Sequence, residues 1–333
     1  MKRLNMAIVS FAHIHAWNYA RILSRMEGAR LVAIYDDNKS RLMKASQAFG
    51  VKEVYDNYEK LLKREDLDAV VVTSENSRHR EHAVLAAEAG KHVLCEKPIA
   101  TSLNDADEII GAARRHGVKL QIAFVMRYHP ATVEVKRLIE EGEIGKVKVI
   151  TATNHGKYPG GWFGDPELAG GGAIMDHTVH VADLMRWYTS SEVYQVYAVK
   201  GDNLRPELKV EDNALISLTF VNGVIGSIDC SWSRPDAWPI WGDVYLAIVG
   251  EEGCLFVDAF RSNVTLAGRG GRFEWVYFGP DPDLKMLKDF VRCILEDEEP
   301  RATGHDGKQA LEVALAAYKA IREGSPVKLP LSY

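Results

Sequence analysis

The run Asp68-Ala69-Val70-Val71-Val72 decides the fold of this chain. Its apolar, β-branched residues continue without the polar alternation of a half-exposed strand, which is typical of a parallel strand covered on both faces. An alanine-rich segment, residues 77–89, follows this run and stops at Gly90, a residue type that favours the end of a helix. The apolar run His92–Cys95 then predicts a second buried strand.

Elements of the same two kinds alternate on either side of this unit. Further strands are predicted at Leu4–Val9 and at residues 31–35 and 118–125, and further helices at residues 13–26, 40–49 and 104–116. Strands that alternate with helices imply a parallel, right-handed, doubly wound α/β sheet. We expect this pattern to form one domain over residues 1–124.

The second half of the chain has strand-like segments without long helices between most of them. These segments are residues 146–154, 193–200, 214–220, 224–232, 244–249 and 254–258, and two helices are predicted at residues 284–295 and 307–322. Asn222-Gly223 between two of the strands is a strong hairpin signal. The pattern predicts an α+β domain over residues 125–333, with a mostly antiparallel, open sheet that helices cover on one face.

The composition is that of a globular protein with a substantial core. Of 333 residues, 47% are hydrophobic and 26% are charged. The net charge is −5 and no block of Lys or Arg stands out, which argues against nucleic-acid binding. The sequence also lacks an apolar stretch of about 18 residues, so we expect no membrane partner. The scattered Cys95, Cys230, Cys254 and Cys293 fit buried thiols in a reducing cytoplasm.

The tripeptide Glu96-Lys97-Pro98 directly follows the strand His92–Cys95. Open α/β sheets bind ligands outside the carboxyl ends of their strands, so Lys97 is expected at a ligand-binding edge. A lysine there can hold an anion or share a proton with a reacting hydroxyl. A solvated loop lysine is the alternative that the tripeptide alone leaves open.

The first strand-to-helix turn lacks the glycines of a G-x-G-x-x-G phosphate loop. It reads Ser10-Phe11-Ala12-His13-Ile14-His15, but it still opens a helix whose free N–H groups favour a phosphate. Asp36 ends the second strand, where an acid accepts the adenosine ribose hydroxyls of a dinucleotide; a turn or capping role is the alternative. Asp37 adds negative charge that would repel a 2′-phosphate, so NAD is favoured over NADP.

His13 and His15 admit two interpretations. An imidazole near a phosphate can donate a hydrogen bond to it. A His-x-His sequence after a first strand is also typical of metal-dependent barrel hydrolases, in which Asp176 would complete the metal site. Because the antiparallel second half does not supply the eight strand–helix units of such a barrel, we expect no metal.

A polar stripe marks the helix predicted after Gly170-Gly171-Gly172. At helical spacing, Asp176, His180, Asp183 and Trp187 fall on one face. The glycines let backbone approach a neighbour or ligand closely, which argues against a merely solvated face. A carboxylate one turn from a histidine can orient the ring and raise its basicity, and such a histidine can act as a general base near neutral pH.

Together these motifs resemble the Gfo/Idh/MocA family of nicotinamide-dependent sugar and cyclitol oxidoreductases. Further segments carry the resemblance over nearly the full length: Ser74-Glu75-Asn76 with His79, Arg127-Tyr128-His129-Pro130, Trp162, Val210-Glu211-Asp212-Asn213 and Val327-Lys328-Leu329-Pro330. The resemblance implies an N-terminal Rossmann domain that binds the dinucleotide. It also implies a C-terminal domain that binds substrate and forms homodimers or homotetramers through its open sheet. The chain departs from the family at Ser10, Ala12 and His15, where all three glycines of the phosphate loop are replaced.

The resemblance also implies roles for particular residues. Lys97, Asp176 and His180 are expected to be catalytic and, with Trp162, to contact the substrate; Arg127 is a further candidate for shaping the substrate pocket. A position in the core is the alternative for Trp162. Contacts to NAD are expected from Ser10, Phe11, Ala12, His13, Ile14, His15, Asp36, Ser74, Asn76, His79, Glu96, Lys97 and Arg127. The expected reaction moves a hydride between a secondary alcohol of a sugar, sugar derivative or cyclitol and the nicotinamide, with Lys97 and His180 as the acid–base pair. A non-catalytic dinucleotide or sugar sensor on the same fold is the alternative, because the loop of residues 10–15 is altered.

Overall fold

The computed structural model describes residues 3–267 and 273–332, which form two compact units. The first unit is made of the described residues of Met1–Val125 and Asp281–Lys308, and the second of those of Met126–Pro280 and Gln309–Tyr333. The predicted boundary between two domains, at residues 124 and 125, stays a prediction. The first unit also takes in residues 281–308 from the C-terminal part of the chain.

The first unit is built on a parallel sheet with the strand order β3-β2-β1-β4-β5-β6. Its strands are β1 (Leu4–Val9), β2 (Ala29–Tyr35), β3 (Val54–Tyr55), β4 (Ala69–Val72), β5 (His92–Cys95) and β6 (Leu120–Ile122). Every residue of β1 and β4 is buried, as expected for strands covered on both faces. The predicted doubly wound Rossmann sheet is therefore confirmed.

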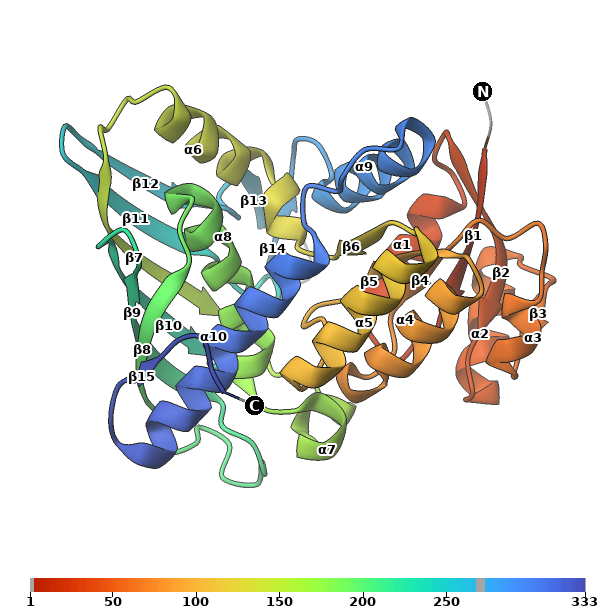
Figure 1. The fold of residues 1–333 in the computed structure, drawn as a ribbon, viewed down its shortest axis with the longest axis horizontal. Coiled ribbons are helices and arrows are strands. Elements are labelled where there is room, and N and C mark those ends of the chain that lie inside the picture. Colours follow the sequence, from red (N-terminus) through yellow and green to blue (C-terminus); the bar gives the residue numbers. More distant parts are fainter. Residues whose placement is uncertain (1–2, 268–272, 333) are drawn as a thin grey trace. The chain divides into compact units, whose positions relative to one another are not determined.

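Helices cover this sheet (Figure 1). They are α1 (His15–Leu23), α2 (Lys39–Phe49), α3 (Tyr58–Leu62), α4 (His79–Glu88), α5 (Leu103–His116) and α9 (Pro282–Glu296), with the 3₁₀ turn η1 (Asn76–Arg78). Helix α1 packs against α2 and α9, and α4 packs against α5. The Asn38 side chain accepts a hydrogen bond at the start of α2, and Gly50 ends that helix in the left-handed conformation with φ 67°.

The register of the sheet brings three loops to one edge. Val9 pairs with Val72 and Val72 pairs with Cys95, so the loops after β1, β4 and β5 begin side by side. The hydroxyl of Thr73 donates a hydrogen bond of 2.7 Å to the carbonyl of Ser10 and so joins two of these loops. Strand order reverses between β1 and β4, and open α/β sheets bind ligands at such a switch point.

The second unit is built on a sheet with the strand order β12-β11-β7-β10-β9-β8-β15. Its strands are β7 (Val147–His155), β8 (Val193–Val199), β9 (Asn213–Phe220), β10 (Ile225–Ser231), β11 (Tyr245–Gly250), β12 (Cys254–Asp258) and β15 (Val327–Lys328). Among the strands of this described sheet, only β7 and β10 pair in parallel. The prediction of a mostly antiparallel sheet is confirmed, and a separate hairpin joins β13 (Asn263–Ala267) to β14 (Phe273–Tyr277).

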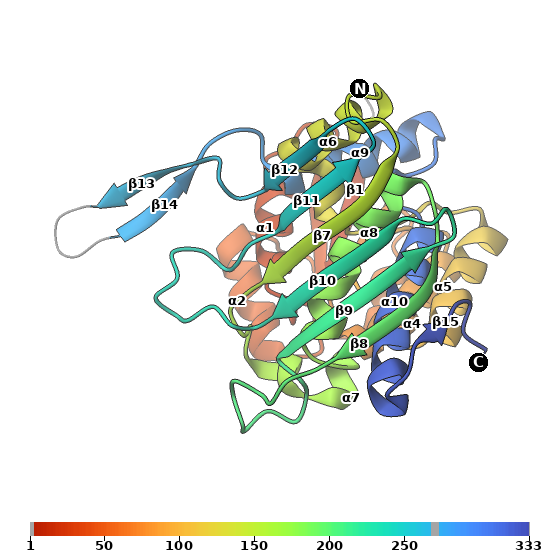
Figure 2. The same cartoon turned by 90° about the vertical axis from the view of Figure 1, so that its left-hand side faces the viewer.

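Helices lie on one side of this sheet and leave its other face open (Figure 2). They are α6 (Pro130–Glu140), α7 (Pro166–Ala169), α8 (Val179–Thr189) and the part of α10 (Gly304–Glu323) from residue 309 on, with the short turns η2 (Val125–Tyr128), η3 (Gly161–Gly164) and η4 (Ile174–Thr178). Burial alternates along the strands, so the exposed Leu215, Ile225, Tyr245 and Phe256 project from the open face. This face therefore carries exposed apolar side chains next to polar ones such as Ser217, Thr219 and Asp229.

Two expectations from composition can be compared with the fold. Cys95, Cys230 and Cys293 are buried thiols as predicted, but Cys254 is exposed because it begins the edge strand β12. Within the described ranges, no helix has the length and apolar character needed to cross a membrane.

A buried ion pair fixes α8 within the second unit. The guanidinium of Arg127, in η2, donates hydrogen bonds of 2.7 and 2.6 Å to the two carboxylate oxygens of Asp183, in α8. The exposed fractions of these side chains are 5% and 1%. A second guanidinium, that of Arg186, lies 3.8 Å from the same carboxylate. Asp183 of the predicted polar stripe therefore serves packing.

We expect Asp183→Ala to lower the free energy of unfolding by about 3–5 kcal/mol, because it leaves a buried guanidinium without its carboxylate. The double change Arg127→Met with Asp183→Leu removes both charges and should recover most of the loss. Urea denaturation followed by tryptophan fluorescence measures both effects. Glu134→Ala, which breaks an exposed ion pair with Arg137, is the control and should hardly move the midpoint. A loss of less than about 1 kcal/mol in Asp183→Ala would contradict the structural role of this pair.

Candidate active site

Glu96 and Lys97 directly follow β5, at the edge of the sheet where the three loops begin. The exposed fraction of Lys97 is 4%, so the interpretation as a solvated loop lysine is wrong. Glu96 is completely buried, and its Oε1 atom accepts hydrogen bonds from the Tyr19 hydroxyl at 2.6 Å and from His15 Nδ1 at 3.0 Å. Its Oε2 atom accepts the backbone N–H of Lys97 at 3.1 Å. The carboxylate thus ties the start of α1 to the end of β5.

The charge on Glu96 is held in place by its neighbours. Burial alone would raise the pKa of this carboxyl, but the nearby His15 and His13 rings lower it well below its ordinary range. Burial lowers the pKa of His15, but the interaction with Glu96 raises it by more. The net pKa of His15 therefore lies above the ordinary imidazole value. At a pH below this raised pKa, His15 and Glu96 form an imidazolium–carboxylate pair.

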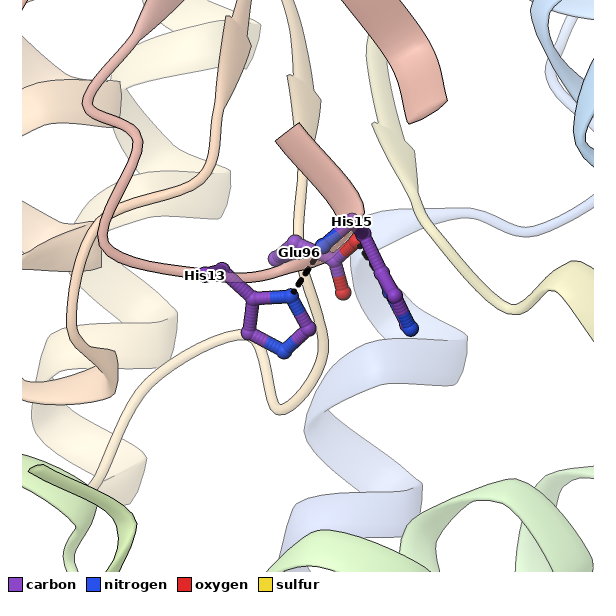
Figure 3. Close-up of side chains that lie close together, drawn as sticks. All are labelled: His13, His15 and Glu96. Atoms are coloured by element: carbon purple, nitrogen blue, oxygen red, sulfur yellow. Dashed lines mark hydrogen bonds and ion pairs between the residues drawn. The ribbon is translucent and has the colours of Figure 1, made fainter. Parts of the chain in front are cut away.

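His13 completes this cluster (Figure 3). The rings of His13 and His15 lie with centroids 4.3 Å apart, and ligand atoms of His13, His15 and Glu96 all lie within 4.8 Å of one another. Two histidines and a glutamate are a donor set that transition metals accept. The hydrogen bonds favour another use: His13 Nδ1 accepts the N–H of His15 at 3.2 Å, and Glu96 already holds His15 and Tyr19.

The loop before α1 uses its own backbone donors. The N–H of Phe11 donates to Asp36 Oδ2 at 2.7 Å and that of Ala12 to Ser10 Oγ at 3.2 Å. The N–H of His13 donates to Thr73 O at 3.0 Å, and that of His15 donates to His13 Nδ1. Ser10 has φ 73°, the left-handed conformation that the first glycine of a phosphate loop would supply. The loop keeps a tight turn without glycine by satisfying its amides internally.

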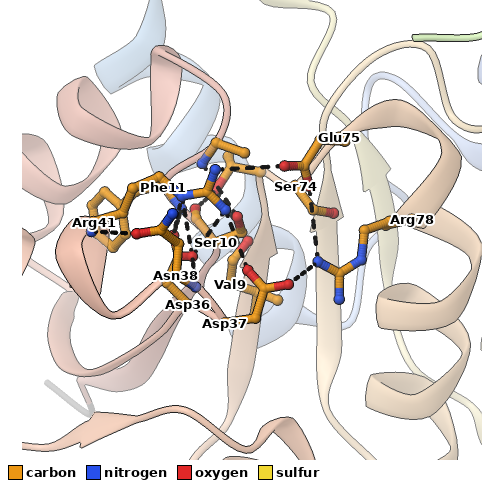
Figure 4. Close-up of polar contacts among 12 residues, drawn as sticks. Val9, Ser10, Phe11, Asp36, Asp37, Asn38, Arg41, Ser74, Glu75 and Arg78 are labelled. Atoms are coloured by element: carbon orange, nitrogen blue, oxygen red, sulfur yellow. Dashed lines mark hydrogen bonds and ion pairs between the residues drawn. The ribbon is translucent and has the colours of Figure 1, made fainter. Parts of the chain in front are cut away.

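Asp36 directly follows β2, as predicted, but it is fully buried. Figure 4 shows its polar contacts. Arg41 Nε lies 3.1 and 3.0 Å from its two oxygens, and the N–H groups of Phe11 and Asn38 donate to it as well. Asp37 pairs with Arg78 at 2.5 Å and with Arg41 at 3.3 Å. The negative charge expected at Asp37 is therefore partly balanced by two guanidinium groups that the sequence analysis did not include.

His79 and Ser74 connect two of the loops at the same edge of the sheet. The His79 ring is fully buried and lies 2.8 Å from Pro98 O and 3.1 Å from Ser74 O. The Ser74 hydroxyl lies 2.9 Å from His82 Nδ1. These contacts join the loop after β4 to the loop after β5, so His79 holds the Glu96-Lys97-Pro98 turn in position. Their predicted contacts to NAD, like that of the buried Asn76, stay predictions.

In the second unit, Asp176 lies in a π-helical turn, η4, where a regular α-helix was predicted. The wider turn changes the angular spacing of the stripe, because the prediction assumed 3.6 residues per turn. Asp176 Oδ2 accepts the indole N–H of Trp232 at 3.1 Å and lies 3.3 Å from His177 Nε2. His177 Nδ1 donates to Asn154 O at 2.8 Å, and this hydrogen bond fixes the His177 ring beside Asp176.

His180 and Trp162 occupy different settings within this unit. His180 begins the regular part of the helix in α8 and is 8% exposed. Trp162 stacks on Phe163 with ring centroids 4.0 Å apart and packs against a core cluster that includes Trp232. His177 and Trp232 were not predicted as site residues. Helical spacing did not place His177 on the face of Asp176, and Trp232 lies 56 residues away along the chain.

A buried carboxylate shapes the start of the π-helical turn. Glu211 Oε1 accepts the N–H of Gly172 at 3.2 Å and that of Ile174 at 2.9 Å, and the Tyr318 hydroxyl donates to it at 2.8 Å. Burial raises the pKa of Glu211, although these hydrogen bonds oppose the shift. A Cβ atom on Gly172 would lie 1.8 Å from the carbonyl oxygen of Glu211. Gly172 therefore permits the close approach predicted for the glycine run.

We expect Gly172→Ala to destabilise the protein by about 3 kcal/mol or more, because the clash is with backbone that cannot yield as a side chain would. The change should also displace Asp176 and lower turnover. Gly111→Ala in α5 is the control: its Cβ would meet only the flexible end of Arg115 at 3.0 Å, and it should be neutral or stabilising. Thermal melting by circular dichroism measures both variants, and equal melting temperatures would contradict the tight packing at Gly172.

Comparison with known proteins places this geometry in a family. Residues 4–124 match the model of an oxidoreductase family with an NAD-binding Rossmann fold, and residues 132–256 match that of the GFO/IDH/MocA C-terminal domain. The chain is 31% identical over 331 residues to the myo-inositol 2-dehydrogenase of Thermotoga maritima, covering 95% of each chain. It is 30% identical over 318 residues to the uncharacterized oxidoreductase YrbE of Bacillus subtilis, covering 92% of this chain and 91% of the other.

A solved structure agrees with the fold over the same length. The crystal structure of a probable dehydrogenase from Thermotoga maritima matches with a TM-score of 0.85 and 29% identity, covering 98% of this chain and 99% of that one. The resemblance recognised from the motifs is confirmed, and the chain belongs to the Gfo/Idh/MocA family of oxidoreductases.

Proposed function

We propose that this protein is an NAD-dependent dehydrogenase or reductase that acts on a secondary alcohol of a sugar, sugar derivative or cyclitol. The observation that carries the proposal is the buried Lys97 at the carboxyl end of β5, beside the loop that opens α1. The similarity to a myo-inositol 2-dehydrogenase supports cyclitols as the first substrates to test.

The first unit fits a dinucleotide. Its switch point between β1 and β4 is bordered by residues 10–15, by the loop from Thr73 to Asn76 and by the Glu96-Lys97-Pro98 turn. These residues, with Asp36, are the ones that we propose to hold NAD. When bound, NAD accepts or supplies a hydride at its nicotinamide ring.

Lys97 and His180 are proposed to manage the proton of the reacting hydroxyl. In the oxidation direction, His180 accepts the hydroxyl proton while the carbon-bound hydrogen leaves as a hydride. The Lys97 ammonium donates a hydrogen bond to the same oxygen and stabilises its alkoxide character. In the reduction direction, His180 returns the proton to the carbonyl oxygen.

Asp176 is proposed to position a substrate hydroxyl or the base, and Trp162 to present a flat apolar face to the substrate ring. Asp176 is itself held by Trp232 and His177, which restrains the orientation of its carboxylate. Arg127 is proposed to act through α8, because its guanidinium is bound to Asp183. A direct contact of Arg127 with NAD stays a prediction.

The non-catalytic sensor remains a second candidate, and one observation favours it. The amides of residues 11, 12, 13 and 15 all have acceptors within the protein, so the loop offers a dinucleotide few backbone donors. Retention of Lys97, Asp176 and His180 favours the enzyme instead. Binding of NADH without hydride transfer to any sugar or cyclitol of a broad panel would support the sensor.

We also propose that the open sheet face, with its exposed apolar side chains, joins subunits in a homodimer or homotetramer. Leu215 and Phe256 on this face are 52% and 67% exposed in the single chain, and apolar surface of this kind marks association sites.

We expect Lys97→Ala and His180→Ala each to lower turnover by about 10²- to 10⁴-fold, because each removes a group that stabilises or transfers charge on the reacting oxygen. The assay follows NADH absorbance with inositols, sugars and sugar nucleotides. NADH affinity, measured by fluorescence titration, should change little in either variant. Lys52→Ala, at an exposed lysine, is the control. Near-normal turnover in either catalytic variant would contradict the acid–base pair.

We expect NADH to bind more tightly than NADPH, because Asp36, Asp37 and Glu75 hold the guanidinium of Arg41 by three carboxylates. Asp37→Asn removes one of these negative charges and frees Arg78 in part. The ratio of NADH affinity to NADPH affinity should therefore fall several-fold. Asp66→Asn, before the amino end of β4, is the matched control. Tighter binding of NADPH than of NADH to the unaltered protein would overturn the NAD preference.

A further inference from the structure

The loop before α1 has few free backbone N–H groups with which to bind the pyrophosphate of a dinucleotide. Of the amides of residues 11–15, all within the described chain, only that of Ile14 has no acceptor inside the protein. In a glycine-rich loop several such amides point at the phosphates. A dinucleotide bound here therefore needs donors from side chains.

His15 is the side chain best placed to supply one. It is the first residue of α1, where the helix dipole favours an anion, and its side chain is 35% exposed. Its Nδ1 atom is used by Glu96 at 3.0 Å, which leaves the Nε2 edge of the ring to face a ligand. His13 stands beside it with Nδ1 accepting a backbone N–H, so its proton lies on Nε2.

The charge of Glu96 makes the protonation of His15 decisive. With a neutral His15, the buried carboxylate would lose its largest stabilising charge and be offset mainly by the more weakly coupled Lys97, so it would repel the two phosphates more strongly. With a protonated His15, the pair is neutral and the ring retains an N–H donor. The buried Tyr19 hydroxyl donates to the same Oε1 atom and adds no charge.

On the basis of the proposed use of NAD, we propose that protonated His15, paired with Glu96, binds the pyrophosphate in place of the missing glycine-loop amides. Cofactor affinity is then linked to the protonation of this pair. In this way the His-x-His sequence of the loop, residues 13–15, has a role in cofactor binding. The proposed hydride transfer does not use these histidines.

The groups facing His15 set the direction of the pH effect. Glu96 and Asp283 of α9 raise the pKa of His15, while burial and the positive charge of Lys97 lower it. Asp283 is bound by Asn18 of α1, and burial raises the pKa of Asp283 to about 6. Pyrophosphate binding would raise the pKa of His15 further. Affinity should therefore be constant below the pKa of His15 in the free protein and fall above it, by up to about tenfold per pH unit for one proton.

The experiment measures NADH binding to the full-length protein by fluorescence titration between about pH 7 and 9, where the Asp283 carboxyl is mostly ionised. Calorimetry in two buffers of different ionisation enthalpy counts the protons taken up on binding. His15→Gln should bind NADH weakly and without pH dependence. His15→Lys carries a charge throughout this range and should bind tightly, also without pH dependence. His116→Gln, at an exposed histidine in the last turn of α5, is the control and should keep the unaltered slope.

Several outcomes would overturn the proposal. NADH affinity that does not change with pH, with no proton uptake, overturns it and leaves the proposed function intact. A slope that persists in His15→Gln and His15→Lys assigns the proton to another group. A slope that EDTA abolishes assigns the His13, His15 and Glu96 cluster to a metal. Absence of NADH binding at every pH overturns both this inference and the proposed function. Circular dichroism of each variant establishes that it is folded.

Discussion

A negative charge buried at the end of β5 constrains the whole of the first unit. Glu96 has no exposed surface, so its charge must be met by groups inside the protein. His15, Tyr19 and the N–H of Lys97 meet it, and in doing so they fix the start of α1 against the turn that carries Lys97. Because β1, β4 and β5 end in register, this one carboxylate links the loop before α1 to the ligand edge of the sheet. Removing it would take away the partner that keeps His15 protonated and would release the turn.

The sequence was sufficient for the kind of both sheets but not for their strand order. The valines of β4 predict a strand covered on both faces, and the lack of long helices between the later strands, with Asn222-Gly223, predicts a mostly antiparallel sheet. Short elements such as β3 and α3 were missed, because two paired residues or one helical turn produce no periodicity. The hairpin of β13 and β14 was missed as well, since it stands apart from the larger sheet.

The site was predictable only as far as it lies at the ends of strands. Lys97, Glu96 and Asp36 follow strands and were placed correctly, but the engagement of Asp36 by Arg41 depends on a side-chain conformation that spacing does not encode. The partners of Asp176 were missed for a different reason. A π-helical turn changes which residues share a face, and it depends on the tertiary contact of Gly172 with Glu211. Glu211 lies 37 residues from Ile174 along the chain, beyond the reach of any local pattern.

The internal hydrogen bonds of residues 10–15 also bear on how the protein behaves between turnovers. A glycine-rich loop with unsatisfied amides gains much of its order from the ligand that it binds. Here Ser10, Thr73 and Asp36 provide that order from within, so the loop keeps its shape when the dinucleotide departs. A preformed loop loses little conformational entropy on binding and needs no refolding on release. Such a loop suits a dinucleotide that enters and leaves as a second substrate, with each catalytic cycle returning the protein to the same resting state.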